Sequence, residues 1–99
     1  MRRKISFLVI GESAAQSHGR DITVAGRCLD GPILIGDHFR QIQDRGKAGS
    51  IDLIVEEISA YGKLLSQLDS VVTGNLILSG RLSRPLTDHT VIVGDEAEQ

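Results

Sequence analysis

Residues 51–68, IDLIVEEISAYGKLLSQL, decide between two folds for this chain. Its first half is rich in β-branched residues, which favour a strand. Gly62 interrupts the pattern and costs a helix about 1 kcal/mol relative to Ala. However, the apolar residues also recur at the i, i+3, i+4 spacing of an amphipathic helix, namely Ile51, Ile54, Val55, Ile58, Tyr61, Leu65 and Leu68. Periodicity alone therefore leaves two folds open, an α+β fold with a helix at 51–68 and an all-β fold.

The rest of the chain consists of short apolar runs separated by glycine-containing turns, which is typical of many short strands. The turn residues Asp30-Gly31-Pro32 and Gly36-Asp37 are of this kind. We expect polar or exposed loops at 11–19 and 43–50 and a connection at 81–88. The pattern predicts strands at 4–10, 20–29, 33–35, 38–42, 75–80 and 89–93.

The composition is typical of a small globular protein, and the net charge is too small to favour a strongly charged partner. The 99 residues include 11 Lys+Arg and 13 Asp+Glu, a formal net charge of -2, which is not the basic footprint of a nucleic-acid-binding protein. The single Cys28 excludes an internal disulfide and a cysteine-based zinc site. We expect one domain, 1–99, with its core at about 4–93 and a frayed acidic end at 94–99. We expect neither a signal peptide nor a membrane helix, and we expect a cytoplasmic protein.

No set of residues in the sequence converges on a catalytic or metal-binding pattern. His18, His38 and His89 have no ligand spacing, although Asp37-His38 and Asp88-His89 could form pH-sensitive pairs. Cys28 is in phase with apolar residues of its strand and is expected to be buried. Neighbouring carboxylates on a strand point to opposite faces, so we expect one of Glu56 and Glu57 to face solvent and the other to mark a bulge.

A phosphate-binding loop is absent as well. Gly46-Lys47 is the nearest approach to the Gly-x-x-x-x-Gly-Lys-Ser/Thr motif, but Gln41 and Ala48 occupy the positions of the first glycine and the magnesium-binding hydroxyl. We therefore expect no enzyme activity, no cofactor and no metal.

Several segments, taken in order, resemble the second domain of the translational GTPases of the elongation factor Tu type. In that family an aliphatic strand leads to a loop, a Gly-Arg strand, a Gly-x-Ile-x-x-Gly-Asp/Glu hairpin and a later fifth strand. The corresponding segments here lie between residues 7 and 80 and are Phe7–Ile10, Gly19–Arg27, Gly31–Asp37, Tyr61–Leu65 and Thr73–Gly80. The resemblance implies an all-β fold, a small closed six-stranded Greek-key barrel. It favours a strand at 51–60 and a turn or short helical piece at 62–68.

The resemblance also implies a weak binding site. Family members can hold the aminoacyl end of a charged tRNA between the first loop, the Gly-Arg strand and the fifth strand. Glu12 keeps the acidic character of that loop, and Arg27 is the arginine of the second strand, but Ala15 replaces an aromatic residue. A threonine is replaced by Ala25, and the family's asparagine falls near Thr73 or Asn75. Because methyl groups replace two contacts, we expect this pocket to have diverged.

These observations lead to three hypotheses about function. The first is a non-catalytic stand-alone binding module that contacts a protein partner or its own copy as a homo-oligomer. The second is a translation-related accessory factor that binds RNA or the ribosome, although the net charge disfavours RNA. The third, a small enzyme, has the least support because no acid, base, nucleophile or metal set is visible.

Overall fold

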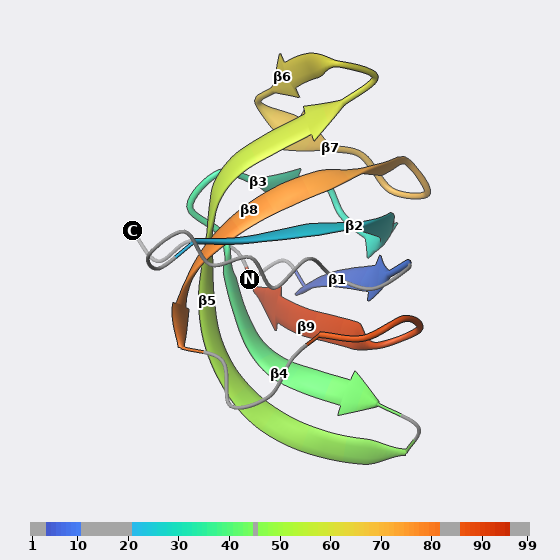
Figure 1. Cartoon of the computed structure of the whole chain (residues 1–99), viewed down its shortest axis with the longest axis vertical. Helices are drawn as coiled ribbons and strands as arrows, with labels where there is room; N and C mark the ends of the chain where they lie inside the picture. Colours follow the sequence, from blue (N-terminus) through green and yellow to red (C-terminus); the bar gives the residue numbers. More distant parts are fainter. Residues whose placement is uncertain (1–3, 11–20, 45, 82–85, 96–99) are drawn as a thin grey trace.

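The computed structural model describes residues 4–10, 21–44, 46–81 and 86–95, and every regular element in them is a β-strand. Six strands close into an antiparallel barrel in the order β4-β9-β1-β2-β8-β5, with β5 pairing back to β4 (Figure 1). Two pairs of successive strands, β1 with β2 and β4 with β5, are neighbours in the barrel, whereas β2 and β4, which are connected through β3, lie apart, as in a Greek-key arrangement. The barrel strands are β1 (Lys4–Val9), β2 (Asp21–Asp30), β4 (His38–Asp44), β5 (Lys47–Ala60), β8 (Thr73–Arg81) and β9 (Val91–Asp95).

Three short strands lie outside the closed barrel. β6 (Lys63–Leu65) pairs with Ile58–Ala60 of β5, beyond the stretch of β5 that pairs with β4, and β3 (Ile33–Leu34) pairs with β7 (Gln67–Leu68). The prediction of a turn or helical piece at 62–68 is therefore wrong. The exposed turn Tyr61-Gly62, with φ values of 55° and 75°, reverses the chain so that Lys63–Leu65 can pair with Ile58–Ala60.

The structure decides the ambiguity at 51–68 in favour of a strand. β5 is 14 residues long and curves around the barrel from its hairpin with β4 to its pairing with β6 (Figure 1). The expected loop at 43–50 is wrong, because the pairing of β4 with β5 continues as far as Asp44 and Lys47. Here Gly46 has a φ of 82°, a conformation that costs glycine little.

The end of the described chain is also more ordered than predicted. Gly94 and Asp95 belong to β9 instead of a frayed acidic tail, because Asp95 is paired with Lys4 on one side and His38 on the other. Arg40 Nε donates a hydrogen bond of 3.0 Å to Asp95 Oδ1. Residues 96–99, the expected loop at 11–19 and residues 82–85 of the expected connection lie outside the described part.

The barrel interior is aliphatic, with two buried aromatic rings. Inward and outward residues alternate along β2, as a strand with one buried face requires. The register of β5 against β8 shifts between Val55 and Glu57, so the predicted bulge at the two glutamates is confirmed. The largest fully buried side chains are Phe7, Phe39, Ile5, Ile33, Ile42, Leu53, Ile58, Leu68, Leu76, Leu78, Leu86 and Ile92.

Candidate binding face

Four of the five residues to which the resemblance assigns a binding role lie together on the outside of the barrel. Ala25 is paired with Asn75, and Arg27 is paired with Thr73, across the antiparallel strands β2 and β8. Directly paired residues present their side chains to the same face, and all four are exposed. Thr73 and Asn75 are two residues apart on β8, so both belong to this face. Glu12, together with Ala15, lies outside the described residues.

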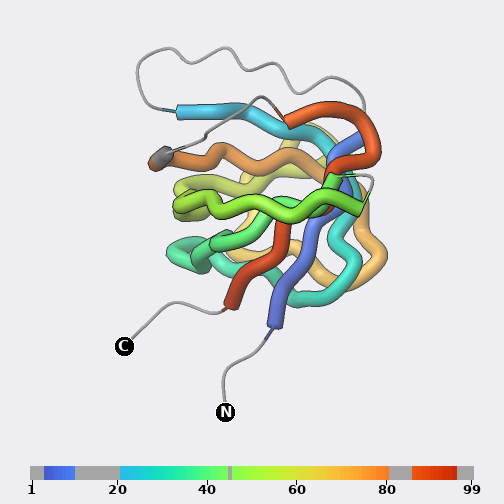
Figure 2. The backbone as a smooth tube through the Cα atoms, turned by 90° about the horizontal axis from the view of Figure 1, so that it is seen from below, coloured from blue at the N-terminus to red at the C-terminus, as the bar shows by residue number. Residues whose placement is uncertain are grey.

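A third strand, which sequence reasoning missed, completes the face. β5 pairs with the other edge of β8, so Ser59 lies beside Asn75 and Glu57 lies beside Ile77. Figure 2 shows β2, β8 and β5 side by side, in light blue, orange and yellow-green. No local signal reveals these neighbours, because the bulge in β5 changes the register. We call this surface the β2–β8–β5 face; its residues are Thr23, Ala25, Arg27, Thr73, Asn75, Ile77, Glu57 and Ser59.

The face is mixed in character: of its eight residues Arg27 and Glu57 are charged and lie at opposite corners, and Glu56, whose carboxylate accepts a hydrogen bond of 2.8 Å from Ser79 Oγ, adjoins the Glu57 corner. Arg27 Nε donates a hydrogen bond of 3.2 Å to the carbonyl oxygen of Val71. Within the described residues, neither Arg27 nor Glu57 forms a salt bridge. Two exposed apolar residues lie at the edge of the β2–β8–β5 face. Leu64, 72% exposed, is paired with Ser59, and Val71, 66% exposed, is the residue whose carbonyl oxygen accepts the hydrogen bond from Arg27. Such a surface can contact a protein through polar, charged and apolar groups together.

The histidine and aspartate pairs do not build a catalytic site. His38 contacts Asp52 instead of its neighbour Asp37, and His89 Nδ1 lies 2.7 Å from Asp88 Oδ2. Asp37 is buried and its Oδ2 accepts a hydrogen bond of 2.8 Å from the backbone N–H of Leu34, so it stabilises the turn between β3 and β4. Within the described ranges no three His, Cys, Asp or Glu side chains gather into a possible metal site.

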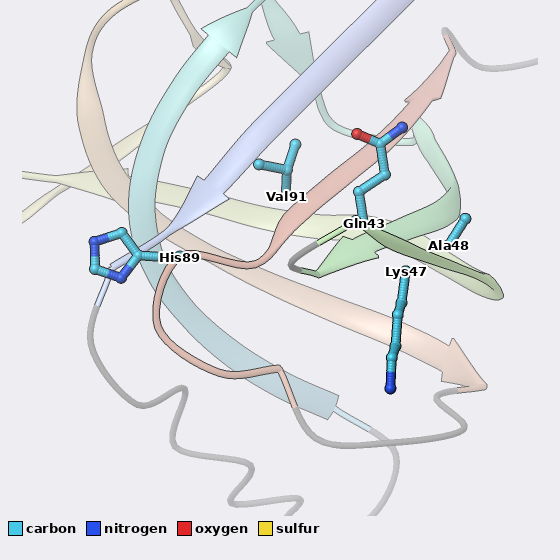
Figure 3. Close-up of a pocket in the computed structure, with 6 residues that line it drawn as sticks. Gln43, Lys47, Ala48, His89 and Val91 are labelled. Carbon is cyan, nitrogen blue, oxygen red and sulfur yellow. The ribbon is translucent and has the colours of Figure 1, made fainter.

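A cavity of about 330 Å³ lies beside the tip of the β4–β5 hairpin. Gln43 and Val91 point to one side of it, whereas Lys47 extends the opposite way and the His89 ring points away from both (Figure 3). Its polar groups therefore do not converge on one point, as a catalytic or anion-binding site requires. Its lining residues are Gln43, Gly46, Lys47, Ala48, His89 and Val91.

Cys28 is buried, as predicted, and its thiol is not an activated nucleophile. Its exposed fraction is 0%. Burial raises the pKa of the Cys28 thiol from its ordinary value near 9 to about 11, and the carboxylates of Asp30 and Asp69 add to this effect. A nucleophilic cysteine needs the opposite shift, toward the thiolate.

This raised pKa predicts a loss of stability at alkaline pH. Between pH 9 and 11 the unfolded chain loses the thiol proton while the native protein keeps it, so the free energy of unfolding falls as pH rises. Two pKa units correspond to about 2.7 kcal/mol. Urea unfolding of the wild type and Cys28→Ala at pH 8 and pH 10.5 should show the wild type losing more stability than the variant. Equal losses in the two proteins would contradict the assignment.

The described part of the chain holds no helix of the length and apolar character needed to cross a membrane. In comparisons with known proteins, no family model matches the chain and no curated protein matches it.

Proposed function

We propose that this chain is a non-catalytic binding module that contacts a protein surface, a partner's or that of a second copy, through the β2–β8–β5 face. The observation that carries the proposal is the pairing of Ala25 with Asn75 and of Arg27 with Thr73 in one exposed patch. The resemblance to the second domain of the translational GTPases points to the same patch. Its altered residues favour a contact other than an aminoacyl end.

A protein surface fits this face better than RNA does. Single-stranded nucleic acid is held by aromatic rings on which bases stack and by a positively charged groove. Phe7 and Phe39 are fully buried, so Tyr61 is the remaining aromatic side chain. The charges of Arg27 and Glu57 balance, and the whole chain carries a net charge of -2. The translation-related RNA-binding role therefore stands as an outcome of the test.

A substitution at the centre of the face should abolish binding. Asn75→Arg places a long cation between β2 and β5, and a bulky charge buried at the centre of an interface weakens binding strongly. We expect the immobilised wild type to retain a specific protein from native extract, identified by mass spectrometry, and Asn75→Arg to lose it at least tenfold. The matched control is Gln41→Arg, which also replaces an amide side chain by arginine, at an exposed position of β4.

Two results would contradict this function. Equal retention by the wild type, Asn75→Arg and Gln41→Arg would show that the face is not used. A labelled RNA that binds the wild type with a steep dependence on salt concentration would favour the accessory-factor role instead, because phosphate contacts release counterions.

A further inference from the structure

We propose that the occupant of the β2–β8–β5 face is a second copy of this chain, packed face to face about a two-fold axis. This inference rests on the proposed function and names its partner. It follows from the strand registers, which place complementary residues at positions that a two-fold rotation brings together.

The face is a grid of three strands and three rows. The row of Arg27 and Thr73 comes first, and the row of Ala25, Asn75 and Ser59 comes second. The third row consists of Thr23, Ile77 and Glu57. Asn75 is therefore at the centre of the grid, and Arg27 and Glu57 lie at opposite corners.

These two charges cannot neutralise each other within one molecule. They are separated by two strand spacings and by four residues along the strands, which together amount to about 17 Å. Within the described residues, one molecule therefore presents on this face a cation, Arg27, and a carboxylate, Glu57, that form no salt bridge. A two-fold interface can pair both charges, because each residue of one copy meets a different residue of the other and the contact occurs twice.

A two-fold axis in the plane of the interface, passing over Asn75 and perpendicular to the line from Arg27 to Glu57, produces this pairing. It sets Arg27 of each copy against Glu57 of the other. The same rotation brings Ala25 toward Ile77 of the second copy.

The same rotation also brings polar side chains of one copy against polar side chains of the other. Thr73 is brought toward Ser59 of the second copy, and the two Asn75 amides meet at the centre, where an amide can both donate and accept. In this arrangement the strands of one copy cross those of the other at a steep angle. The packing is therefore closer to the orthogonal class of sheet packing than to the aligned class.

Self-association through β6, which is the edge strand of the sheet in the described part of the chain, is a weaker alternative. β6 has three residues, one of them Lys63, and short strands that carry lysine are how proteins protect an edge against further pairing. The complementary features lie on the face of the sheet and not on this edge.

Charge reversal tests the arrangement. We expect the wild type to sediment as a dimer at micromolar concentration. Arg27→Glu and Glu57→Arg should each weaken the dimer about 100-fold, because each places two like-charge contacts in the symmetric interface. Mixing the two monomeric variants should restore a heterodimer. In it, the glutamate introduced at position 27 of one copy faces the arginine introduced at position 57 of the other, and the second contact is the native pair of Glu57 with Arg27. The double variant should dimerise on its own, because both of its contacts again join opposite charges.

Lys63→Glu is the matched control, because it reverses an exposed charge outside the face, and it should leave the dimer unchanged. Circular dichroism of each single variant shows whether the barrel remains folded. A monomeric wild type, or a dimer that persists in both single variants, would overturn the two-fold packing. In that case the proposed function would still stand if Asn75→Arg, but not Gln41→Arg, abolished the capture of another protein.

Discussion

Gly26→Ala should lower the free energy of unfolding by about 3 kcal/mol, at the upper end of the usual cost of overpacking a core. A Cβ at this position would collide with the carbonyl oxygen of Leu8 and would lie 2.7 Å from Cε2 of the Phe7 ring. The carbonyl belongs to the neighbouring strand β1, and the ring is fully buried. Neither group can move without disturbing the pairing of β1 and β2, so the strain cannot be relieved locally.

Urea unfolding followed by circular dichroism measures this effect. Gly46→Ala is the control, because a Cβ at Gly46 meets no atom within 4 Å and the φ of 82° is its main difficulty. It should cost only about 1 kcal/mol, the usual strain of a left-handed residue other than glycine. If Gly26→Ala were no more destabilising than Gly46→Ala, the close approach of β1 to β2 would be wrong.

The ambiguity of residues 51–68 has a physical origin that the sequence could not reveal. Inward residues of β5 alternate up to Val55, and the bulge then inserts one extra residue, so the next inward side chain is Ile58. The resulting step of three imitates the spacing of a helix, whereas Ile54, which also fits the helical pattern, points outward and is partly exposed. A bulge can therefore give a strand the apolar spacing of a helix. For residues 51–60, pairing with β4 and β8 shows that the segment is a strand.

The candidate face was only partly predictable for a similar reason. The alternation of β2 identifies Thr23, Ala25 and Arg27 as outward residues from the sequence alone. The resemblance supplies Thr73 and Asn75. Strands that are distant in sequence can pair in many registers, and a shift of one residue exchanges the two faces. Glu57 and Ser59 could therefore be assigned to the face only after the pairing of β5 with β8 was known.

Phe7→Ala should lower the free energy of unfolding by about 4 kcal/mol, because removal of a buried phenyl ring loses its transfer free energy and leaves a cavity. Phe7 is one of only two aromatic residues in the barrel interior, and the aliphatic side chains around it are held by strands that cannot collapse inward. Domains of this kind are stable by only about 5–15 kcal/mol, so the midpoint of urea unfolding should fall sharply. A loss below about 1 kcal/mol would contradict the burial of Phe7.

A double-mutant cycle with Phe7→Leu tests whether the Phe7 ring is one of the groups that make glycine necessary at position 26. Leucine lacks the Cε2 and Cζ atoms that lie 2.7 Å and 2.9 Å from the site of a Cβ at Gly26. In the Phe7→Leu background, Gly26→Ala should therefore cost less than in the wild type, by an interaction free energy of about 1 kcal/mol. The collision with the Leu8 carbonyl remains, so the two changes should not cancel completely. Strict additivity in this double-mutant cycle would show that the backbone of β1 alone makes glycine necessary at position 26.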